Sequence, residues 1–212
     1  MELEEFVSAS TTIEATPLVP EIRLHLATEL TPLWHATESF LNKQNIDAPF
    51  WAFAWVGGQA LARYVLDRPD VVRGKRVADI GSGGGIVSIA AAKAGAQRVV
   101  ALDIDPLAAI VCGLNAGLNG AETLVERVTA DAIEYDLSAF DLILVGDVCY
   151  TRGEAQDLTR HLDRQVAPVF FGDPGRQFMP RENLRHLAAY DVVTSTEIEA
   201  EEITEASVWQ MI

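Results

Sequence analysis

The sequence predicts an α/β protein with a mostly parallel, twisted sheet that a C-terminal antiparallel hairpin completes. Three observations predict this fold: apolar strands alternate with helical patterns from residue 75 onward, a glycine loop joins the first such strand to its helix, and the last two segments resemble a hairpin. The chain has 212 residues, 49% of them hydrophobic, which is enough for a sizeable core.

We expect residues 1–212 to form a single domain with two parts. No internal repeat, low-complexity tract or long linker divides the chain. Residues 1–74 are predicted to form a helical, aromatic-rich segment that ends in PFWAFAWVGGQALARYVLD. Residues 75–212 are predicted to form the α/β core.

The core elements follow one another in βαβ order. The predicted strands are RVADI, RVVALDI, TLVERVTA, DLILVGD and APVFFGD, the predicted helices cover residues 85–94, 106–118 and 153–166, and DVVTSTEIEA with EITEASVWQMI forms the hairpin. The second helix has the clearest boundaries, because Asp105 is a good N-cap, Pro106 suits the first turn and Gly120 lies beyond the end.

The charge of the chain limits its partners. Its 16 basic and 31 acidic residues give a formal net charge of −15. Nucleic-acid affinity comes largely from Lys and Arg side chains that displace counterions, so this charge opposes nucleic-acid binding. A basic protein or a small molecule is the better partner.

Nothing in the sequence predicts export, membrane insertion or a metal site. No apolar run approaches the ~18 residues that span a bilayer, and MELEEFVSAS lacks a signal-peptide pattern. Cys112 and Cys149 are far apart, and the four histidines form no ligand cluster. We therefore expect a soluble, cytoplasmic protein with no membrane association, disulfide or structural metal.

The glycine loop in VADIGSGGGIVSIAAAKAGA indicates the class of ligand. A dinucleotide fingerprint would need glycine at Ile86 or Ser88, and a phosphate P-loop would need Gly-Lys-Ser/Thr, which is absent. The remaining pattern, D-x-G-x-G-x-G from Asp79, resembles motif I of S-adenosylmethionine-dependent methyltransferases. An acid near the loop suits a cationic amine, although a tight strand-to-helix turn alone would also explain the glycines.

A second acid follows the next strand. Asp103 ends VVALD about 20 residues after the loop, where a carboxylate can accept hydrogen bonds from both ribose hydroxyls. NAD enzymes use the same arrangement. Asp103 therefore supports a nucleoside ligand but does not distinguish NAD from S-adenosylmethionine. The spacing of the glycines favours S-adenosylmethionine.

The stretch DLILVGDVCYTRGEAQDL predicts the site of chemistry. Its apolar strand has the pattern of a central strand and leads to Asp147 at the mouth of the ligand crevice. Thr151 and Glu154 form a T-x-x-E capping box for the next helix, so Asp147 is not needed as its cap. Asp147 and Tyr150 are thus left to face the acceptor, with no structural role that the sequence indicates.

A narrower family resemblance follows from several segments together: PFWAFAWVGGQALARYVLD, GKRVADIGSGGGIVSIAAAKAGA, ALDIDPLAAIVCGLNAGLNG, DLILVGDVCYTRG, FFGDPGRQF and SVWQMI. They resemble the lysine methyltransferases that modify the β subunit of electron transfer flavoprotein, with DVCY and GDPGR as the most specific motifs. The resemblance implies a Rossmann-like class I methyltransferase fold, S-adenosyl-L-methionine as donor, and a basic, lysine-containing loop of the flavoprotein subunit as acceptor.

The resemblance also assigns site residues. It implies that Asp147 and Tyr150 are the catalytic pair that holds the acceptor lysine. The donor site is implied to comprise Trp55, Asp79, Gly81, Ser82, Gly83, Asp103, Ile104, Asp131, Ala132 and Gly146, with Trp55 as a wall and Asp131 and Ala132 at the adenine. Val56 stands where the family has proline in its Trp-Pro-Gly-Gly motif.

Other residues have two interpretations. Asp131 could be a solvated loop residue, and Asp173 with Arg176 in GDPGR could contact the acceptor or form a turn. Phe50, Trp51 and Phe53 are interpreted as packing residues. The glutamates of the final hairpin could attract a basic acceptor or could be a solvated edge: Glu197, Glu199, Glu201, Glu202 and Glu205.

Two other functions remain open from the sequence. The chain could methylate another acceptor, such as a ribosomal protein, although DVCY replaces the N-P-P-Y loop of several amide and base methyltransferases. It could also be a non-catalytic module that binds the nucleoside ligand, although the acid and tyrosine at the crevice argue for catalysis.

Overall fold

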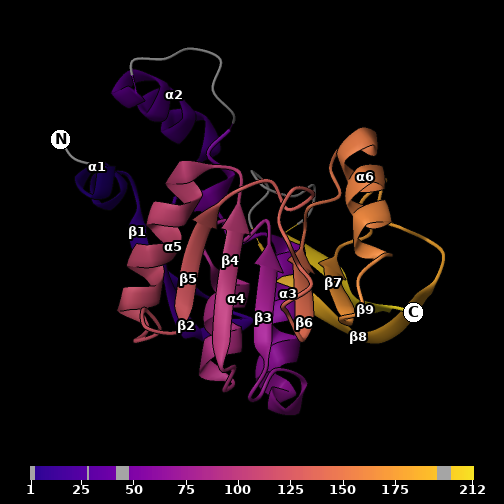
Figure 1. Cartoon of the computed structure of the whole chain (residues 1–212). Coiled ribbons are helices and arrows are strands. Elements are labelled where there is room, and N and C mark those ends of the chain that lie inside the picture. The colour runs from indigo at the N-terminus through magenta and orange to yellow at the C-terminus, as the bar shows by residue number, and fades with distance from the viewer. Residues whose placement is uncertain (1–2, 28, 42–47, 195–201) are drawn as a thin grey trace.

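The computed structural model describes residues 3–27, 29–41, 48–194 and 202–212, and it contains a seven-stranded sheet with helices on both faces (Figure 1). The strand order is β5-β4-β3-β6-β7-β9-β8, and a separate two-stranded sheet pairs β1 with β2. The helices are α1 (Leu3–Ser10), α2 (Leu30–Leu41), α3 (Val56–Asp67), α4 (Ile86–Lys93), α5 (Pro106–Leu118) and α6 (Arg152–Leu162). The strands are β1 (Thr12–Thr16), β2 (Val19–Leu26), β3 (Arg76–Ile80), β4 (Arg98–Asp103), β5 (Val125–Thr129), β6 (Leu142–Gly146), β7 (Val169–Asp173), β8 (Leu184–Val193) and β9 (Ile203–Met211).

The strand order places a topological switch point at β3. Strand β3 pairs in parallel with β4 on one side and β6 on the other, and β4 and β6 continue in parallel to β5 and β7. The chain continues from β3 to β4 and β5 on one side and then crosses to β6 and β7 on the other. Because the strand order reverses at β3, a crevice opens at the carboxyl ends of β3, β4 and β6. Strand β9 then runs antiparallel to both β7 and β8, which confirms a C-terminal antiparallel hairpin. Its first strand is Leu184–Val193 rather than the predicted residues 191–200, of which residues 195–200 lie outside the described chain.

The sheet is buried on both faces in its centre. Every residue of β7, and all but one of the residues of β3 and of β6, is buried. One face packs against α3, α4, α5 and β2, and the other packs against α6 and the loops at residues 132–140. This two-sided burial explains why the central strands are continuously apolar rather than alternating.

The N-terminal segment is not entirely helical, which corrects the expectation for residues 1–74. Strands β1 and β2 form an antiparallel hairpin there. Asn115 of α5 accepts a hydrogen bond at Oδ1 from the His25 N–H at 2.7 Å, and Asn119 Nδ2 donates to the carbonyl of Arg23 at 2.7 Å. The buried side chains of Val19, Ile22 and Leu24 face the core, so α5 stabilises the hairpin through contacts distant in sequence.

The predicted helix caps agree with the structure in part. Asp105 is the N-cap of α5, and its Oδ1 accepts a hydrogen bond from the Leu107 N–H at 2.8 Å. Thr151 is the N-cap of α6, but its hydroxyl donates to the Glu154 carboxylate and accepts no backbone N–H of the helix. The capping box is therefore only half formed. Helix α6 also ends at Leu162, before the predicted end at Val166, which is fully exposed.

No helix within the described parts of the chain combines the length and apolar character that crossing a membrane requires.

Candidate active site

The glycine loop between β3 and α4 makes a tight turn at the carboxyl edge of the sheet. Gly81, Gly83 and Gly85 have positive φ angles of 65°, 48° and 85°, a region that residues with a Cβ rarely occupy. A Cβ at Gly85 would also lie 2.6 Å from Cys112 Sγ. The turn requires these glycines, and it aims the start of α4 at the crevice.

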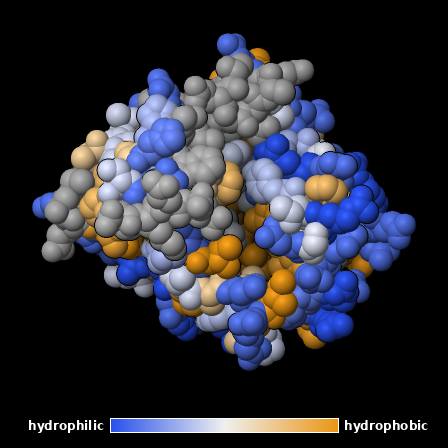
Figure 2. All heavy atoms as spheres, turned by 90° about the horizontal axis from the view of Figure 1, so that it is seen from above, coloured by the Kyte–Doolittle hydropathy of each residue, from blue (hydrophilic) through white to orange (hydrophobic). Residues whose placement is uncertain are grey.

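A cavity lies beside this loop. Six of the predicted donor residues line it: Trp55, Asp79, Gly81, Ser82, Gly83 and Gly146. The rest of the lining is Leu24, Leu26, Trp51, Phe53, Ala54, Gly58, Gly84, Ile86, Val87 and Asn115. Viewed from above the strand ends, Figure 2 shows apolar side chains in a hollowed region of this face between hydrophilic margins.

Three polar groups of the cavity lining are suited to a charged ligand. Asp79 is 1% exposed and accepts a hydrogen bond from the Ser88 hydroxyl at 2.6 Å. Burial raises the pKa of Asp79 to about 7. Trp51 Nε1 and Ser82 Oγ are buried with no hydrogen-bond partner among the described residues. A ligand with an ammonium group and a carboxylate, such as the amino-acid tail of S-adenosylmethionine, would satisfy these groups.

Trp51 was missed as a site residue by the sequence interpretation, which assigned it to packing. The side chain is indeed 2% exposed and belongs to the core around α1 and α5. Its indole N–H is nevertheless an unpaired donor in the lining of the cavity. No sequence pattern could separate these roles, because the unpaired N–H is visible only in the tertiary structure. Phe53 is also buried and lines the cavity, whereas Phe50 is 51% exposed.

Asp103 supports the glycine loop directly. Its Oδ2 accepts a hydrogen bond from the Gly83 N–H at 2.8 Å, and its Oδ1 accepts one from the Asp105 N–H at 3.0 Å. Burial raises the pKa of this half-buried carboxyl group. Each carboxylate oxygen can accept a further hydrogen bond, so contact with ribose hydroxyls stays a prediction that is compatible with this geometry.

The other predicted donor residues lie at the ends of β4 and β5, outside the lining of the cavity. Ile104 is 69% exposed, and Ala132 is buried. Asp131 is exposed and accepts a hydrogen bond at Oδ1 from the Ile133 N–H at 2.9 Å, as a loop aspartate does. The roles of these three residues at the nucleoside remain predictions.

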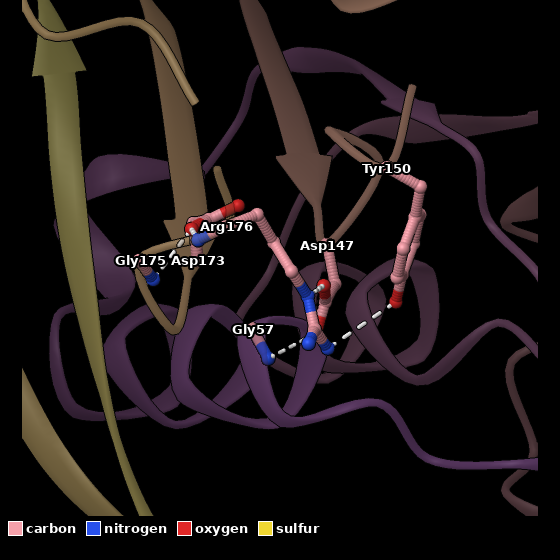
Figure 3. A network of polar contacts seen from close by, with 6 residues as sticks. All are labelled: Gly57, Asp147, Tyr150, Asp173, Gly175 and Arg176. Carbon is pink, nitrogen blue, oxygen red and sulfur yellow. Dashed lines mark hydrogen bonds and ion pairs between the residues drawn. The ribbon is translucent and has the colours of Figure 1, made fainter. Parts of the chain in front are cut away.

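Asp147 is the centre of a polar network after β6 (Figure 3). Its side chain is 0% exposed. The backbone of Asp147 has a positive φ of 56°, which is unusual for a non-glycine residue. Arg176 Nε donates to Asp147 Oδ1 at 2.8 Å, and Arg176 Nη2 donates to Oδ2 at 3.2 Å. The Gly57 N–H also donates to Oδ2, at 2.9 Å. The structure thus gives Asp147 a structural role, which corrects the expectation that it has none.

Tyr150 lies on the other side of the Arg176 guanidinium. The ring centroid of Tyr150 is 4.9 Å from Arg176 Cζ, and its hydroxyl oxygen is 3.4 Å from Arg176 Nη2. Tyr150 is 43% exposed and its ring lies 5.7 Å from that of Trp55, a residue of the cavity lining. The structure therefore brings the two predicted catalytic residues together, with a cation between them and the cavity beside them.

The GDPGR segment forms the predicted turn and also reaches the site. Asp173 Oδ1 accepts hydrogen bonds from the Gly175 N–H at 2.6 Å and the Arg176 N–H at 2.7 Å. Burial raises the pKa of Asp173 to about 6. The turn fixes the backbone from which Arg176 extends to Asp147.

The acidic residues of the final hairpin are only partly within the described chain. Glu202 and Glu205 are exposed, and Glu197, Glu199 and Glu201 lie outside the described residues. Within the described ranges, no group of three or more His, Cys, Asp and Glu side chains could hold a metal ion.

The fold is the one found in class I S-adenosylmethionine-dependent methyltransferases. A magnesium protoporphyrin IX methyltransferase from Synechocystis with bound S-adenosylmethionine matches with a TM-score of 0.56 at 20% identity, over 74% of this chain and 81% of that one. An RNA methyltransferase from Salinibacter ruber in complex with S-adenosyl-L-homocysteine matches with a TM-score of 0.53 at 23% identity, over 71% of this chain and 90% of that one. Residues 59–146 match the family model for ribosomal protein L11 methyltransferase (PrmA).

Curated relatives specify the family. The electron transfer flavoprotein β subunit lysine methyltransferase of Homo sapiens is 34% identical over 98% of this chain and 81% of its own length. The zebrafish (Danio rerio) protein of the same name is 38% identical over 99% and 83%. A ribosomal protein L11 methyltransferase of Geobacter sulfurreducens is 41% identical, but over only 50% of this chain and 31% of its own length. The chain belongs to the electron transfer flavoprotein β subunit lysine methyltransferase family.

Proposed function

We propose that this protein transfers methyl groups from S-adenosylmethionine to lysine side chains of the electron transfer flavoprotein β subunit. The observation that carries the proposal is the pairing of Asp147 and Tyr150 around a cation, next to a cavity with unpaired polar groups. The acid and the aromatic ring form a site for a positively charged side chain. Family membership supplies the acceptor.

The residues of the site fit the requirements of the reaction. S-adenosylmethionine supplies an electrophilic methyl group on a sulfonium. A lysine amine with a pKa near ~10.4 is protonated at neutral pH and must lose a proton before it can attack. Most of the catalysis can then come from holding the amine in line with the methyl group.

Asp147 and Tyr150 have distinct parts in this scheme. Asp147 would orient the amine and stabilise the positive charge that forms on its nitrogen, because a buried carboxylate interacts strongly with a nearby cation. Tyr150 would hold the same group through its ring face or hydroxyl. Methylated lysine stays cationic, so the same pair accommodates repeated methylation.

The charge of the protein suits a basic acceptor. The formal net charge of −15 attracts a lysine-containing loop and repels a nucleic-acid backbone. The exposed Glu202 and Glu205 add to this field at the C-terminal strand. We expect the acceptor KM to rise with salt, because salt screens attraction between exposed charges.

Mass spectrometry of a defined reaction tests the proposal. Purified protein, S-adenosylmethionine and the flavoprotein β subunit are incubated, and methylated lysines are identified in peptide digests. Ribosomal protein L11 serves as the competing acceptor, because residues 59–146 match that family model. Methylation of the flavoprotein subunit supports the proposal; methylation of L11 alone would replace it with the second function; and donor binding without methylation of either would contradict it.

A further inference from the structure

We infer that Arg176 occupies the position of the acceptor ammonium in the free enzyme, so that the incoming lysine must displace it. The inference rests on the proposed function, because it concerns the Asp147–Tyr150 pair. Arg176 would thereby act as an internal surrogate of the acceptor and determine which lysines gain access. Figure 3 shows Arg176 extending from the loop after β7 toward Asp147 and Tyr150.

The first argument is the occupancy of the Asp147 carboxylate. A carboxylate has about four acceptor positions. Two guanidinium N–H groups of Arg176 and the Gly57 N–H take three of them, at 2.8, 3.2 and 2.9 Å. The Asp147 side chain is also 0% exposed. A lysine amine therefore cannot bind Asp147 while the guanidinium remains in place.

The second argument is that Arg176 makes the contacts expected of the acceptor. Its charged carbon, Cζ, lies 4.9 Å from the centre of the Tyr150 ring, within the range of a cation–π interaction. Its Nη2 is 3.4 Å from the Tyr150 hydroxyl oxygen. One cation thus satisfies the acid and the aromatic ring together, which is the role that the proposed function gives to the acceptor lysine.

The third argument is that displacement requires only a side-chain movement. The Arg176 backbone is held by the turn in which Asp173 accepts the Gly175 and Arg176 N–H groups. The Arg176 side chain is 20% exposed and can rotate about its long stem toward solvent. The turn, β7 and Asp147 can therefore keep their positions during the exchange.

This exchange would make the enzyme selective for lysines of proteins that also contact the surface around the site. The apparent affinity for a ligand falls by the fraction of enzyme in the competent state, here the fraction with Arg176 displaced. A lysine in a folded protein that also contacts the surrounding surface can offset this loss. Free lysine and short peptides cannot, so Arg176 would exclude them.

The substitution R176K tests the position directly. The amine of a lysine side chain stands about where Cζ of arginine stands, so R176K places a nucleophile at the predicted acceptor position. Its neutral amine would attack the donor methyl group as the carbon–sulfur bond breaks, the bonding electron pair would stay on sulfur, and the amine would release a proton to solvent. We expect methylation at position 176, at a rate independent of enzyme concentration. Q177K is the matched control, because Gln177 is exposed in the same loop.

The substitution R176A tests the displacement. In R176A no internal cation competes, and a bound acceptor ammonium restores the charge pair with Asp147. We expect the acceptor KM to fall by ~10-fold and short lysine peptides to be newly accepted. An unchanged or higher KM with a large loss of kcat would show that Arg176 only supports Asp147, and would overturn the inference.

The two variants also separate this inference from the proposed function. Self-methylation of R176K needs only the donor, so it can be measured whatever the acceptor protein is. If wild-type enzyme methylates the flavoprotein subunit but R176K is not modified at position 176, the inference is wrong and the proposed function stands. If R176K is self-methylated while the wild-type enzyme ignores the flavoprotein subunit, the acceptor is wrong and the inference stands.

Discussion

Replacing Asp147 by Asn should lower both stability and catalysis, for separate reasons. Asn preserves size and can still accept the Gly57 N–H, which lies 2.9 Å from Oδ2. It removes the charge opposite Arg176, whose Nε is 2.8 Å from Oδ1. Because the Asp147 side chain is 0% exposed, this change breaks an ion pair that is buried on the acid side.

The size of the stability loss follows from this burial. Breaking a buried pair costs about 3–5 kcal/mol, and the lower end applies because Arg176 is 20% exposed and can turn toward water. For a chain of this size, 1 kcal/mol corresponds to about 2–4 °C in Tm, so D147N should lower Tm by about 6–12 °C. The catalytic loss should be ~10²-fold or more in kcat at a temperature where the variant is folded.

A double-mutant cycle with R176Q assigns the stability loss to the pair. In D147N/R176Q two neutral amides face each other, so we expect the double variant to recover about 1–3 kcal/mol relative to the sum of the single losses. Thermal and urea unfolding measure stability, and single-turnover methylation measures the chemical step. Additive stability losses would refute the assignment of a coupled ion pair, and wild-type turnover by D147N would refute a catalytic role for Asp147.

Three further predictions concern the donor site and the fold. D103N should weaken donor binding about tenfold in calorimetry, because the single oxygen of an amide cannot replace both carboxylate oxygens, which accept the Gly83 and Asp105 N–H groups. D105N is the control, because Asn caps a helix as well as Asp and should bind the donor normally; equal donor affinities of D103N and D105N would contradict this prediction. The Asp79 carboxyl should lower stability as pH rises between 3.8 and about 7, because the folded state holds the Asp79 proton that the unfolded state loses. Asp173 and Asp103 act in the same direction, so D79N should reduce this slope but not abolish it in urea unfolding at several pH values, and an unchanged slope would exclude Asp79 as a source. G57A should lower the free energy of unfolding by about 1–3 kcal/mol, because its Cβ would lie 2.3 Å from the Gly172 carbonyl oxygen. G58A should lower it less, because the nearest atom to its Cβ, Ile86 Cγ2, is 3.5 Å away; the opposite order in thermal unfolding would argue against close packing of α3 on β7.

Local sequence patterns were sufficient for most of the core. The parallel strands, the glycine turn, the α5 cap at Asp105 and the last strand of the C-terminal hairpin agree with the structure, whereas the first strand of that hairpin begins earlier than predicted. Each of these features depends on residues close together in the chain, such as an apolar run or a cap with its N–H. The location of the cavity beside the glycine loop follows as well, because a glycine loop after a parallel strand must lie at the carboxyl edge of the sheet.

The N-terminal hairpin could not be predicted in the same way. The turn of residues 12–26 contains Pro17 but none of the Asn-Gly or Asp-Gly pairs that mark a two-residue hairpin. The hairpin is held by Asn115 of α5 and by Asn119 just after that helix, about 90 residues further along the chain. Trp51 shows the same limit at the site. Its residue type predicts burial, but only the arrangement of the cavity leaves its N–H unpaired.

The sequence by itself determined the class of fold, the family and the position, after β6, of the acid that is predicted to be catalytic. Only the tertiary structure decided that this acid is already paired. Asp147 and Arg176 are 29 residues apart, and nothing in either local segment indicates the other. They meet because β6 and β7 are parallel neighbours, which brings the loops after both strands to the same edge of the sheet. An ion pair between two such loops depends on strand order, and strand order is a property of the whole fold.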